Sequence, residues 1–249
     1  MIKHRIQILK KEWLSPNIFS IECDLPHINP TPGQFLQIQI TDYFDPLLNR
    51  PISIADYDRG RLLMIIKVVG KGTRILAEKK VGDELIVFGP FGKRLNILDK
   101  KSLIIAGGIG VAPLYFLARK LQSRKIDFTF VYGARTPVEL VLKKELQRIT
   151  NKVIFITEKG SKKRGTAISV LQEIDLSKYE IGYACGPKPM LKELKAMDLK
   201  FPIYAFCEDF LGCGAGLCLG CAIEYYGVYK RICEDGPIFE LKGLCLDNV

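Results

Sequence analysis

The sequence lacks an uncharged run of the length that a membrane span requires. Its longest uncharged stretch, residues 102–118, carries three glycines and one proline and falls short of the roughly 20 apolar residues of a transmembrane helix. The first residues, MIKHRIQILKKEW, also lack the apolar core and the small-residue cleavage site of a secretory signal. We therefore expect a cytoplasmic protein without a membrane span.

A concentrated basic surface is also lacking, although the net charge is +10. The 37 lysines and arginines are spread along the chain and form neither a basic helix nor an aromatic RNA-binding motif. The sequence therefore predicts no nucleic-acid partner. Internal repeats are lacking too, and 249 residues with 48% apolar side chains are enough for more than one compact domain.

The first hundred residues predict a small antiparallel β-barrel. Residues 33–40 alternate apolar and polar side chains, and further short apolar segments are separated by Gly, Pro and Asp turns. One helix is expected at 72–80. Several short strands with a single helix are typical of a small barrel, which we assign to residues 1–97.

From residue 101 the pattern changes to strands that alternate with helices. Strands are predicted at 102–106, 127–134, 152–158, 181–186 and 202–207, and helices at 114–124, 137–149 and 187–197. This alternation predicts a doubly wound parallel α/β sheet, which we assign to residues 98–206. Residues 207–249, rich in Gly and Cys and containing a hairpin-like segment at 221–233, are expected to form a small third domain.

Four of the eight cysteines have a spacing that indicates a cofactor. Cys213, Cys218 and Cys221 form a C-x4-C-x2-C motif, and Cys233 follows after eleven further residues. This spacing is typical of a plant-type 2Fe–2S cluster site. The glycines between the cysteines allow a tight loop whose backbone N–H groups can point at sulfur. A four-cysteine zinc site is the alternative, although such sites pair two short cysteine clips.

Two corners in the α/β region are candidates for binding a dinucleotide. They consist of Gly107, Gly108 and Gly110, and of Cys185, Gly186 and Pro187. The first lies between a strand and a helix, where backbone N–H groups and the helix N-terminus can face a pyrophosphate. Both follow strands whose carboxyl ends bind ligands in open α/β sheets. Tight structural turns are the alternative, and Cys185 either faces a nicotinamide or packs in the core.

The barrel region holds candidates for binding a flavin. The segment Arg50-Pro51-Ile52-Ser53 offers a guanidinium for a pyrophosphate and a hydroxyl for the edge of the isoalloxazine ring. Gly72 and Thr73 lie at the start of the expected helix, which is a second anion site. A hydrophobic strand followed by a turn is the alternative for both segments.

The order of these motifs resembles that of the ferredoxin–NADP reductase superfamily. R-P-x-S lies in a barrel, G-x-G-T at a helix start, G-G-x-G-x-A-P at the opening of a nucleotide fold, and C-G-P near its end. With the four-cysteine tail followed by EDGP, the whole chain is similar to the electron-transfer subunits of NAD-linked, class B dihydroorotate dehydrogenases.

The resemblance implies one FAD and one 2Fe–2S cluster per subunit, with NAD as a diffusible acceptor. A catalytic dihydroorotate dehydrogenase subunit would oxidise dihydroorotate to orotate on its FMN, in pyrimidine biosynthesis, and two copies of each subunit would form a heterotetramer. Electrons would pass singly to the cluster and then to the FAD, which would pass a hydride to NAD⁺. No general acid or base is expected in this chain.

The resemblance also assigns residues to cofactors. FAD would be held by Arg50, Pro51, Ile52, Ser53, Ile65, Ile66, Lys67, Gly72 and Thr73, and the cluster by Cys213, Cys218, Cys221 and Cys233. Lys67 stands where an arginine is common. Arg135 lies near where a 2′-phosphate would bind, so the preference for NAD over NADP rests on the resemblance. We also hypothesise that the cysteine-rich tail, with Tyr225 and Tyr226, contacts the partner subunit.

Related flavin subunits are the alternatives. The chain could serve a sulfite reductase, a hydrogenase or an NADH–ferredoxin transhydrogenase. Transhydrogenases often lack the first cluster cysteine, which is present here as Cys213. An alternative of a different class is a zinc-stabilised interaction module that binds no flavin and catalyses no reaction.

Overall fold

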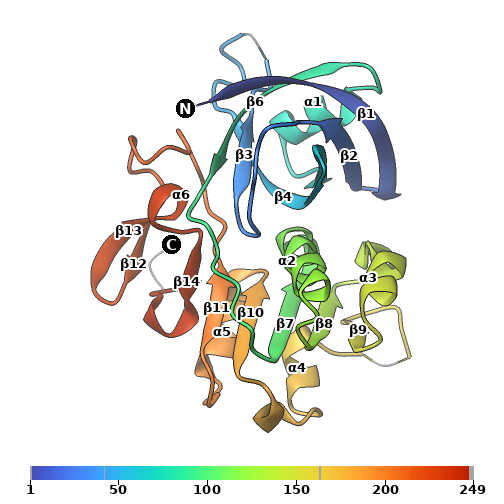
Figure 1. Ribbon diagram of the computed structural model, residues 1–249, viewed down its shortest axis with the longest axis vertical. Helices are drawn as coiled ribbons and strands as arrows, with labels where there is room; N and C mark the ends of the chain where they lie inside the picture. Colours follow the sequence, from blue (N-terminus) through green and yellow to red (C-terminus); the bar gives the residue numbers. More distant parts are fainter. Residues whose placement is uncertain (1, 42, 163, 247–249) are drawn as a thin grey trace.

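The structure is a computed structural model and describes residues 2–41, 43–162 and 164–246 (Figure 1). The N-terminal part forms a closed barrel, the central part forms a six-stranded sheet with helices, and the C-terminal part lies beside both. The predicted combination of a β-barrel, an α/β sheet and a small C-terminal unit is confirmed. No helix in these three described ranges is long and apolar enough to cross a membrane.

The barrel consists of six antiparallel strands in the order β1-β2-β5-β4-β3-β6. Its elements are β1 (Lys3–Ser15), β2 (Ile18–Asp24), β3 (Phe35–Ile38), β4 (Arg50–Asp58), β5 (Arg61–Lys67), α1 (Lys71–Glu78) and β6 (Glu84–Phe91). Side chains alternate along β3 because successive residues of a strand point to opposite faces. Leu36 and Ile38 belong to the barrel core, whereas Phe35 packs outward in a cluster with the C-terminal part.

The sheet is doubly wound, with the strand order β14-β11-β10-β7-β8-β9. Its elements are β7 (Ser102–Gly107), α2 (Val111–Ser123), β8 (Phe128–Ala134), α3 (Lys143–Ile149), β9 (Val153–Thr157), α4 (Ala167–Leu171), β10 (Ile181–Cys185), α5 (Lys188–Ala196), β11 (Ile203–Phe206) and β14 (Ile238–Glu240). All neighbouring strands are parallel except β14, which pairs antiparallel with β11. The strand order reverses between β7 and β10, and ligands of such sheets bind at this point.

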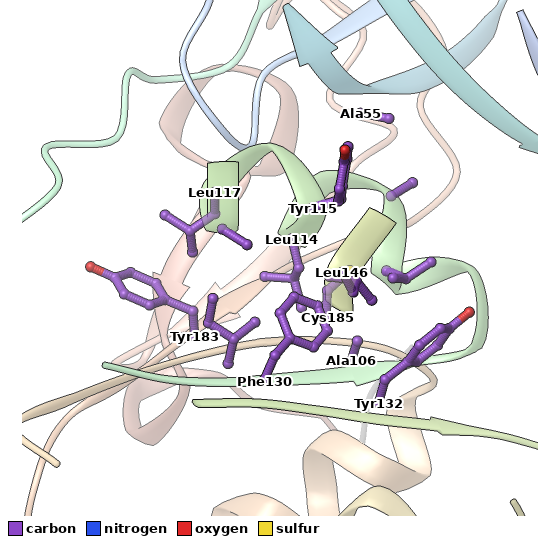
Figure 2. Close-up of a cluster of buried hydrophobic side chains, with 14 of the residues drawn as sticks. Ala55, Ala106, Leu114, Tyr115, Leu117, Phe130, Tyr132, Leu146, Tyr183 and Cys185 are labelled. Carbon is purple, nitrogen blue, oxygen red and sulfur yellow. The ribbon is translucent and has the colours of Figure 1, made fainter. Parts of the chain in front are cut away.

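Helix α2 joins the sheet to the barrel. On one side Leu114 packs against Phe130 in the core that covers this face of the sheet (Figure 2). On the other side Phe116 belongs to the barrel core, and Arg119 Nε lies 3.2 Å from Asp56 Oδ2 of β4. These contacts fix the barrel next to the sheet edge from which α2 starts.

The C-terminal part forms a hairpin and returns to the sheet. The predicted hairpin is confirmed as β12 (Ala222–Tyr225) and β13 (Val228–Arg231), and the short helix α6 (Ile232–Asp235) follows. The chain then enters β14 at the edge of the α/β sheet. The cysteine-rich tail is thereby attached to the sheet by strand pairing.

One expected helix is wrong in its extent. In place of a continuous helix over 137–149, a 3-10 turn at Pro137–Glu139 precedes α3, and Leu142 between them has a left-handed φ of 59°. Tertiary contacts explain the interruption. The Tyr132 hydroxyl donates to the Glu139 carbonyl at 3.0 Å, and the two apolar residues that follow Glu139 are buried in the core.

Candidate functional site

Two cavities meet where the barrel adjoins the carboxyl edge of the sheet. The first, the barrel cavity, has a volume of about 340 Å³, and the second, the sheet-edge cavity, has about 570 Å³. Lys67, Ile109 and Glu208 line both of them. Ligands bound in the two cavities would therefore lie against the same three side chains.

The barrel cavity collects the expected flavin-binding residues. It is lined by Arg50, Pro51, Ile52, Ser53, Ile65, Ile66, Lys67 and Thr73, among others. They come from three neighbouring segments, because β4 carries the R-P-I-S motif, β5 ends at Lys67 and α1 begins soon after. Side chains from the sheet domain, including Ile109 and Phe206, complete the wall.

Gly72 lies behind the cavity wall at the start of α1. A Cβ at Gly72 would lie 2.4 Å from Arg50 Nε, so the absent side chain allows the guanidinium to lie across the helix start. The Thr73 hydroxyl accepts hydrogen bonds from the N–H groups of Val69 and Gly70 and fixes the turn. A guanidinium at a helix N-terminus can bind an anion such as a pyrophosphate.

The sheet-edge cavity collects both glycine corners. Gly107, Gly108, Gly110, Gly186 and Pro187 line it, at the carboxyl ends of β7 and β10. The two corners touch, since a Cβ at Gly110 would lie 2.4 Å from the Cys185 carbonyl oxygen. The cavity thus lies at the N-terminus of α2, where a dinucleotide pyrophosphate would be stabilised.

Cys185 is buried behind this contact and is not among the residues that line either cavity. Its Sγ lies 3.9 Å from Glu208 Oε1. Burial raises the pKa of the Cys185 thiol well above its ordinary value, and the nearby Glu208 carboxyl adds to the effect. The thiol is therefore protonated and supports the wall from behind.

Glu208 was missed by the sequence analysis, although it lines both cavities. Desolvation by the surrounding protein raises the pKa of its carboxyl, although the residue as a whole is exposed, and the hydrogen bond from the Cys185 thiol acts in the opposite direction. The signal was available, because Glu208 closely follows the predicted strand at 202–207, whose carboxyl end lies at the same sheet edge as the glycine corners. Lys67, which also lines both cavities, forms an ion pair in which its Nζ lies 3.6 Å from Glu139 Oε2.

The four spaced cysteines lie together as two pairs. Cys221 Sγ and Cys233 Sγ are 3.3 Å apart and buried, whereas Cys213 and Cys218 form a second, more exposed pair through their side chains. Among the described residues, no group of three or more His, Cys, Asp or Glu side chains meets the geometry of a site for a single metal ion. The paired arrangement suits a centre with two irons, each of which takes two thiolates.

Residues 211–221, here called the thiol loop, surround the sulfurs with backbone donors. N–H groups of Ala215, Leu217 and Cys218 point at Cys213 Sγ at 3.3 to 3.4 Å, and the Gly216 N–H points at Cys233 Sγ at 3.1 Å. Burial alone would raise the pKa of Cys213, but these donors outweigh it and lower the pKa to about 7. Thiolates are the form that binds metal, so the loop suits an anionic cluster.

The thiol loop adjoins the barrel cavity. Leu211 lines that cavity and is two residues from Cys213. Other apolar residues of this segment are open to solvent: Phe210, just before the loop, is 91% exposed, and Leu217 and Leu219 in the loop are 80% and 63% exposed. Of the remaining thiols, Cys207 lines the barrel cavity and Cys23 is buried in the barrel core.

Two protein families match this chain. The iron–sulfur cluster binding domain of dihydroorotate dehydrogenase B matches residues 208–245, and the oxidoreductase NAD-binding domain matches residues 104–196. A protein of Caldanaerobacter subterraneus subsp. tengcongensis named "dihydroorotate dehydrogenase B (NAD(+)), electron transfer subunit" is 35% identical over 245 residues, which cover 95% of this chain and 96% of that protein. A protein of the same name from Desulforamulus reducens is 36% identical over 247 residues and 94% of each chain.

Solved structures show the same arrangement of barrel and sheet. An NADH-dependent reduced ferredoxin-NADP oxidoreductase, studied for flavin-based electron bifurcation, has a TM-score of 0.88 and 28% identity, covering 97% of this chain and 90% of that one. The ferredoxin reductase of carbazole 1,9a-dioxygenase has a TM-score of 0.71 and 25% identity, covering 83% of this chain and 69% of that one.

Proposed function

The chain belongs to the family of the electron-transfer subunits of dihydroorotate dehydrogenase B (NAD(+)), and from this premise we propose that it connects a catalytic dihydroorotate dehydrogenase subunit with NAD⁺ in the cytoplasm. It contains FAD and a 2Fe–2S cluster, uses NAD, and serves pyrimidine biosynthesis. One observation carries the proposal: three candidate cofactor sites are adjacent. The thiol loop adjoins the barrel cavity through Leu211, and the barrel cavity adjoins the sheet-edge cavity through their shared residues.

The cofactors supply single-electron transfer at the cluster and hydride transfer at the flavin. The chain's own residues hold and separate them. Arg50 and the start of α1 would bind the flavin pyrophosphate, and Ser53 offers a hydroxyl to the ring edge. The glycine corners would bind NAD so that its nicotinamide meets the flavin at Ile109, Lys67 and Glu208, the three residues that line both cavities. Cys213, Cys218, Cys221 and Cys233 would bind the cluster.

The partner is proposed to dock over the exposed side of the thiol loop. Leu217 and Leu219 flank the exposed Cys218 and are themselves exposed, as is Phe210 just before the loop, and exposed apolar side chains gathered near one site mark interaction surfaces. Tyr225, which the sequence analysis included, is packed against Phe239 with ring centroids 5.2 Å apart and is less available for docking. We propose a heterotetramer with two copies of each subunit, which the mass of the purified complex tests directly.

The proposal is tested by the visible spectrum of the full chain purified without air, recorded before and after NADH is added. We expect a flavin band on a broad iron–sulfur background, with bleaching of the flavin by NADH. A colourless protein with stoichiometric zinc would overturn the redox function and favour the interaction module.

A second candidate is favoured by the similarity to the NADH-dependent reduced ferredoxin-NADP oxidoreductase. A subunit of that kind would exchange electrons with ferredoxin in place of a dihydroorotate dehydrogenase. The discriminating assay mixes the chain with the catalytic subunit, dihydroorotate and NAD⁺. Formation of NADH that depends on dihydroorotate supports the first function. In a second mixture of the chain, NADH and ferredoxin, reduction of ferredoxin supports the second function if the first mixture forms no NADH.

A further inference from the structure

Gln37 is a buried polar residue between the barrel and the thiol loop, and it belongs to none of the cofactor motifs. It lies on β3 with 1% of its surface exposed. Its inward neighbours Leu36 and Ile38 fill the barrel core, so Gln37 points outward, toward the loop. Glutamine side chains are mostly exposed in proteins. A glutamine that is almost completely buried is therefore held there by specific contacts.

The contacts of Gln37 bracket Cys213. Its side-chain Nε2 donates to the Gly212 carbonyl at 3.4 Å, on one side of the cysteine. On the other side, a Cβ at Gly214 would lie 2.8 Å from the Gln37 amide nitrogen, so the backbone of Gly214 packs directly on this side chain. Gly214 has a φ of 72°, which lets the loop turn at this contact. Gln37 thus fixes where Cys213 lies relative to β3.

The segment that Gln37 fixes is the one that carries the N–H donors to sulfur. The N–H groups of residues 213, 215, 216, 217 and 218 all point at cysteine sulfurs. A Cβ at Gly212 would lie 3.1 Å from Cys218 Sγ, so this residue also packs on the second thiol of the pair. Hydrogen bonds to sulfur set the reduction potential of iron–sulfur centres. A shift of the loop would therefore change the potential.

Gln37 is also next to the flavin motif in the sheet. Its pairing partner on β4 is Pro51, in the middle of the R-P-I-S motif. The residue before Gly212, Leu211, lines the barrel cavity. A single side chain therefore joins the strand next to the flavin motif to the loop that holds the cluster thiols.

We propose that Gln37 is a positioning residue for electron transfer, which sets the cluster potential by holding the thiol loop against the barrel. This inference rests on the proposed function. Without the Gln37 amide the loop would move away from β3, the N–H···S contacts would lengthen, and the reduced cluster would lose stabilisation. The potential of the cluster would then fall relative to that of the flavin.

The test uses Gln37→Met, which keeps the length of the side chain and removes the donor. The variant is expected to fold, because Gln37 Oε1 has no hydrogen-bond partner among the described residues and a buried unpaired oxygen lowers stability. The matched control is Gln39→Met, the same change two residues further along the chain and just past the end of β3, where Nε2 donates to the Thr41 carbonyl at 3.3 Å. Iron, sulfide and FAD contents are measured on the full chain, followed by a redox titration of the cluster monitored by electron paramagnetic resonance.

We expect Gln37→Met to retain its cofactors and to show an altered resonance spectrum with a lower cluster potential. The expected size is a tenfold change in the one-electron equilibrium with the flavin, which corresponds to about 59 mV. Gln39→Met should match the wild type. A full cluster with the wild-type potential in Gln37→Met would overturn the proposal.

A second variant, Gln37→Glu, covers the case in which Gln37→Met does not fold. It keeps the shape of glutamine, cannot donate to Gly212 when ionised, and should also lower the potential. Loss of the cluster from both variants, with retention in Gln39→Met, would overturn the potential-setting role and make Gln37 a structural support. A wild-type chain without a reducible cluster would overturn the proposed function itself, before any variant is compared.

Discussion

At the scale of single residues, the carboxyl of Glu208 is unusual because the surrounding protein desolvates it and raises its pKa, although the residue as a whole is exposed. A raised pKa in the folded state means that the folded protein keeps a proton that the unfolded chain releases. The stability associated with this proton is present below the unfolded pKa of about 4.3 and is lost as the pH rises through the folded value. Because Glu208 is exposed at the open cavities, solvent screens this effect. Glu208→Gln should therefore raise the free energy of unfolding at pH 8 by no more than about 1 kcal/mol, and should change it little at pH 4.5.

Urea unfolding at the two pH values measures this effect. Glu78→Gln, at an exposed position on α1, is the matched control and should leave both midpoints in place. If Glu208→Gln were less stable at pH 8, the carboxylate would have to be ionised and paired in the folded protein, contrary to the expectation.

Cys218 allows a second test at this scale, because it belongs to the exposed thiol pair and lies outside the barrel cavity. We expect Cys218→Ser to lose the iron–sulfur absorbance and most of the iron. Reduction of the flavin by NADH should continue, since the barrel and the sheet-edge cavities do not use this residue. Iron analysis and anaerobic mixing with NADH measure the two properties separately.

Cys245→Ser is the control for Cys218→Ser, because Cys245 is half-buried and belongs to neither thiol pair. It should retain both the cluster and the flavin. Simultaneous loss of flavin and cluster in Cys218→Ser would mean that the thiol loop supports the barrel cavity structurally.

At the scale of elements, the turn from β7 to α2 depends on its contact with the end of β10. A Cβ at Gly110 would lie 2.4 Å from the Cys185 carbonyl oxygen, and a backbone atom cannot yield as a flexible side chain does. Gly110→Ala should separate the two glycine corners and weaken NADH binding by at least about tenfold, or 1.4 kcal/mol, while FAD is retained. Titration of the oxidised protein with a non-reducing NADH analogue measures the affinity.

Gly70→Ala serves as the control for Gly110→Ala. Gly70 precedes α1 in an extended conformation, and an added Cβ would have no atom within 4 Å. NADH affinity should be unchanged in this variant. Equal affinity in both variants would mean that the corner does not bind the dinucleotide.

Elements with a strong local signal were predictable from the sequence. Period-two alternation predicted strands of the barrel, and the glycine corner between a buried strand and a helix predicted the β7–α2 turn. Local sequence patterns failed to predict elements whose extent is determined by tertiary contacts. The segment 137–149 has helical spacing, yet burial of Leu140 and Val141 and the Tyr132 hydrogen bond to the Glu139 carbonyl keep the first half out of the helix. Helix α4 has only five residues, too few for periodicity to be recognised.

The same division holds for the candidate site. The cysteine spacing and the R-P-I-S and glycine motifs are local, so the sequence alone made them candidates. Glu208 and Gln37 matter through contacts with segments distant in the chain, such as the bond from Gln37 to Gly212, 175 residues away. Neither residue stands in a motif, so only the folded arrangement reveals what each one touches.

At the scale of the whole molecule, the thiol loop contacts the barrel cavity through Leu211 and exposes Leu217 and Leu219 to solvent. A protein that donates electrons can approach the cluster thiols there, because Cys218 between the two leucines is also exposed. The exposed leucines beside Cys218 are therefore expected to be covered by the partner subunit. A few residues in the well-packed centre of an interface contribute most of its binding energy, and a charge placed among them is costly.

We expect Leu217→Asp and Leu219→Asp each to weaken binding of the catalytic subunit by about 2 kcal/mol, or roughly thirtyfold in Kd. The cluster and the NADH-driven reduction of the flavin should stay intact, because neither side chain lines the two cavities. Val81→Asp is the matched control, an equally exposed apolar residue between α1 and β6 on the barrel. Sedimentation of the mixed subunits gives the affinity, and dihydroorotate-dependent NADH formation should fall in parallel. Unchanged affinity in both leucine variants would mean that the catalytic subunit binds, and delivers its electrons, at another surface of this chain.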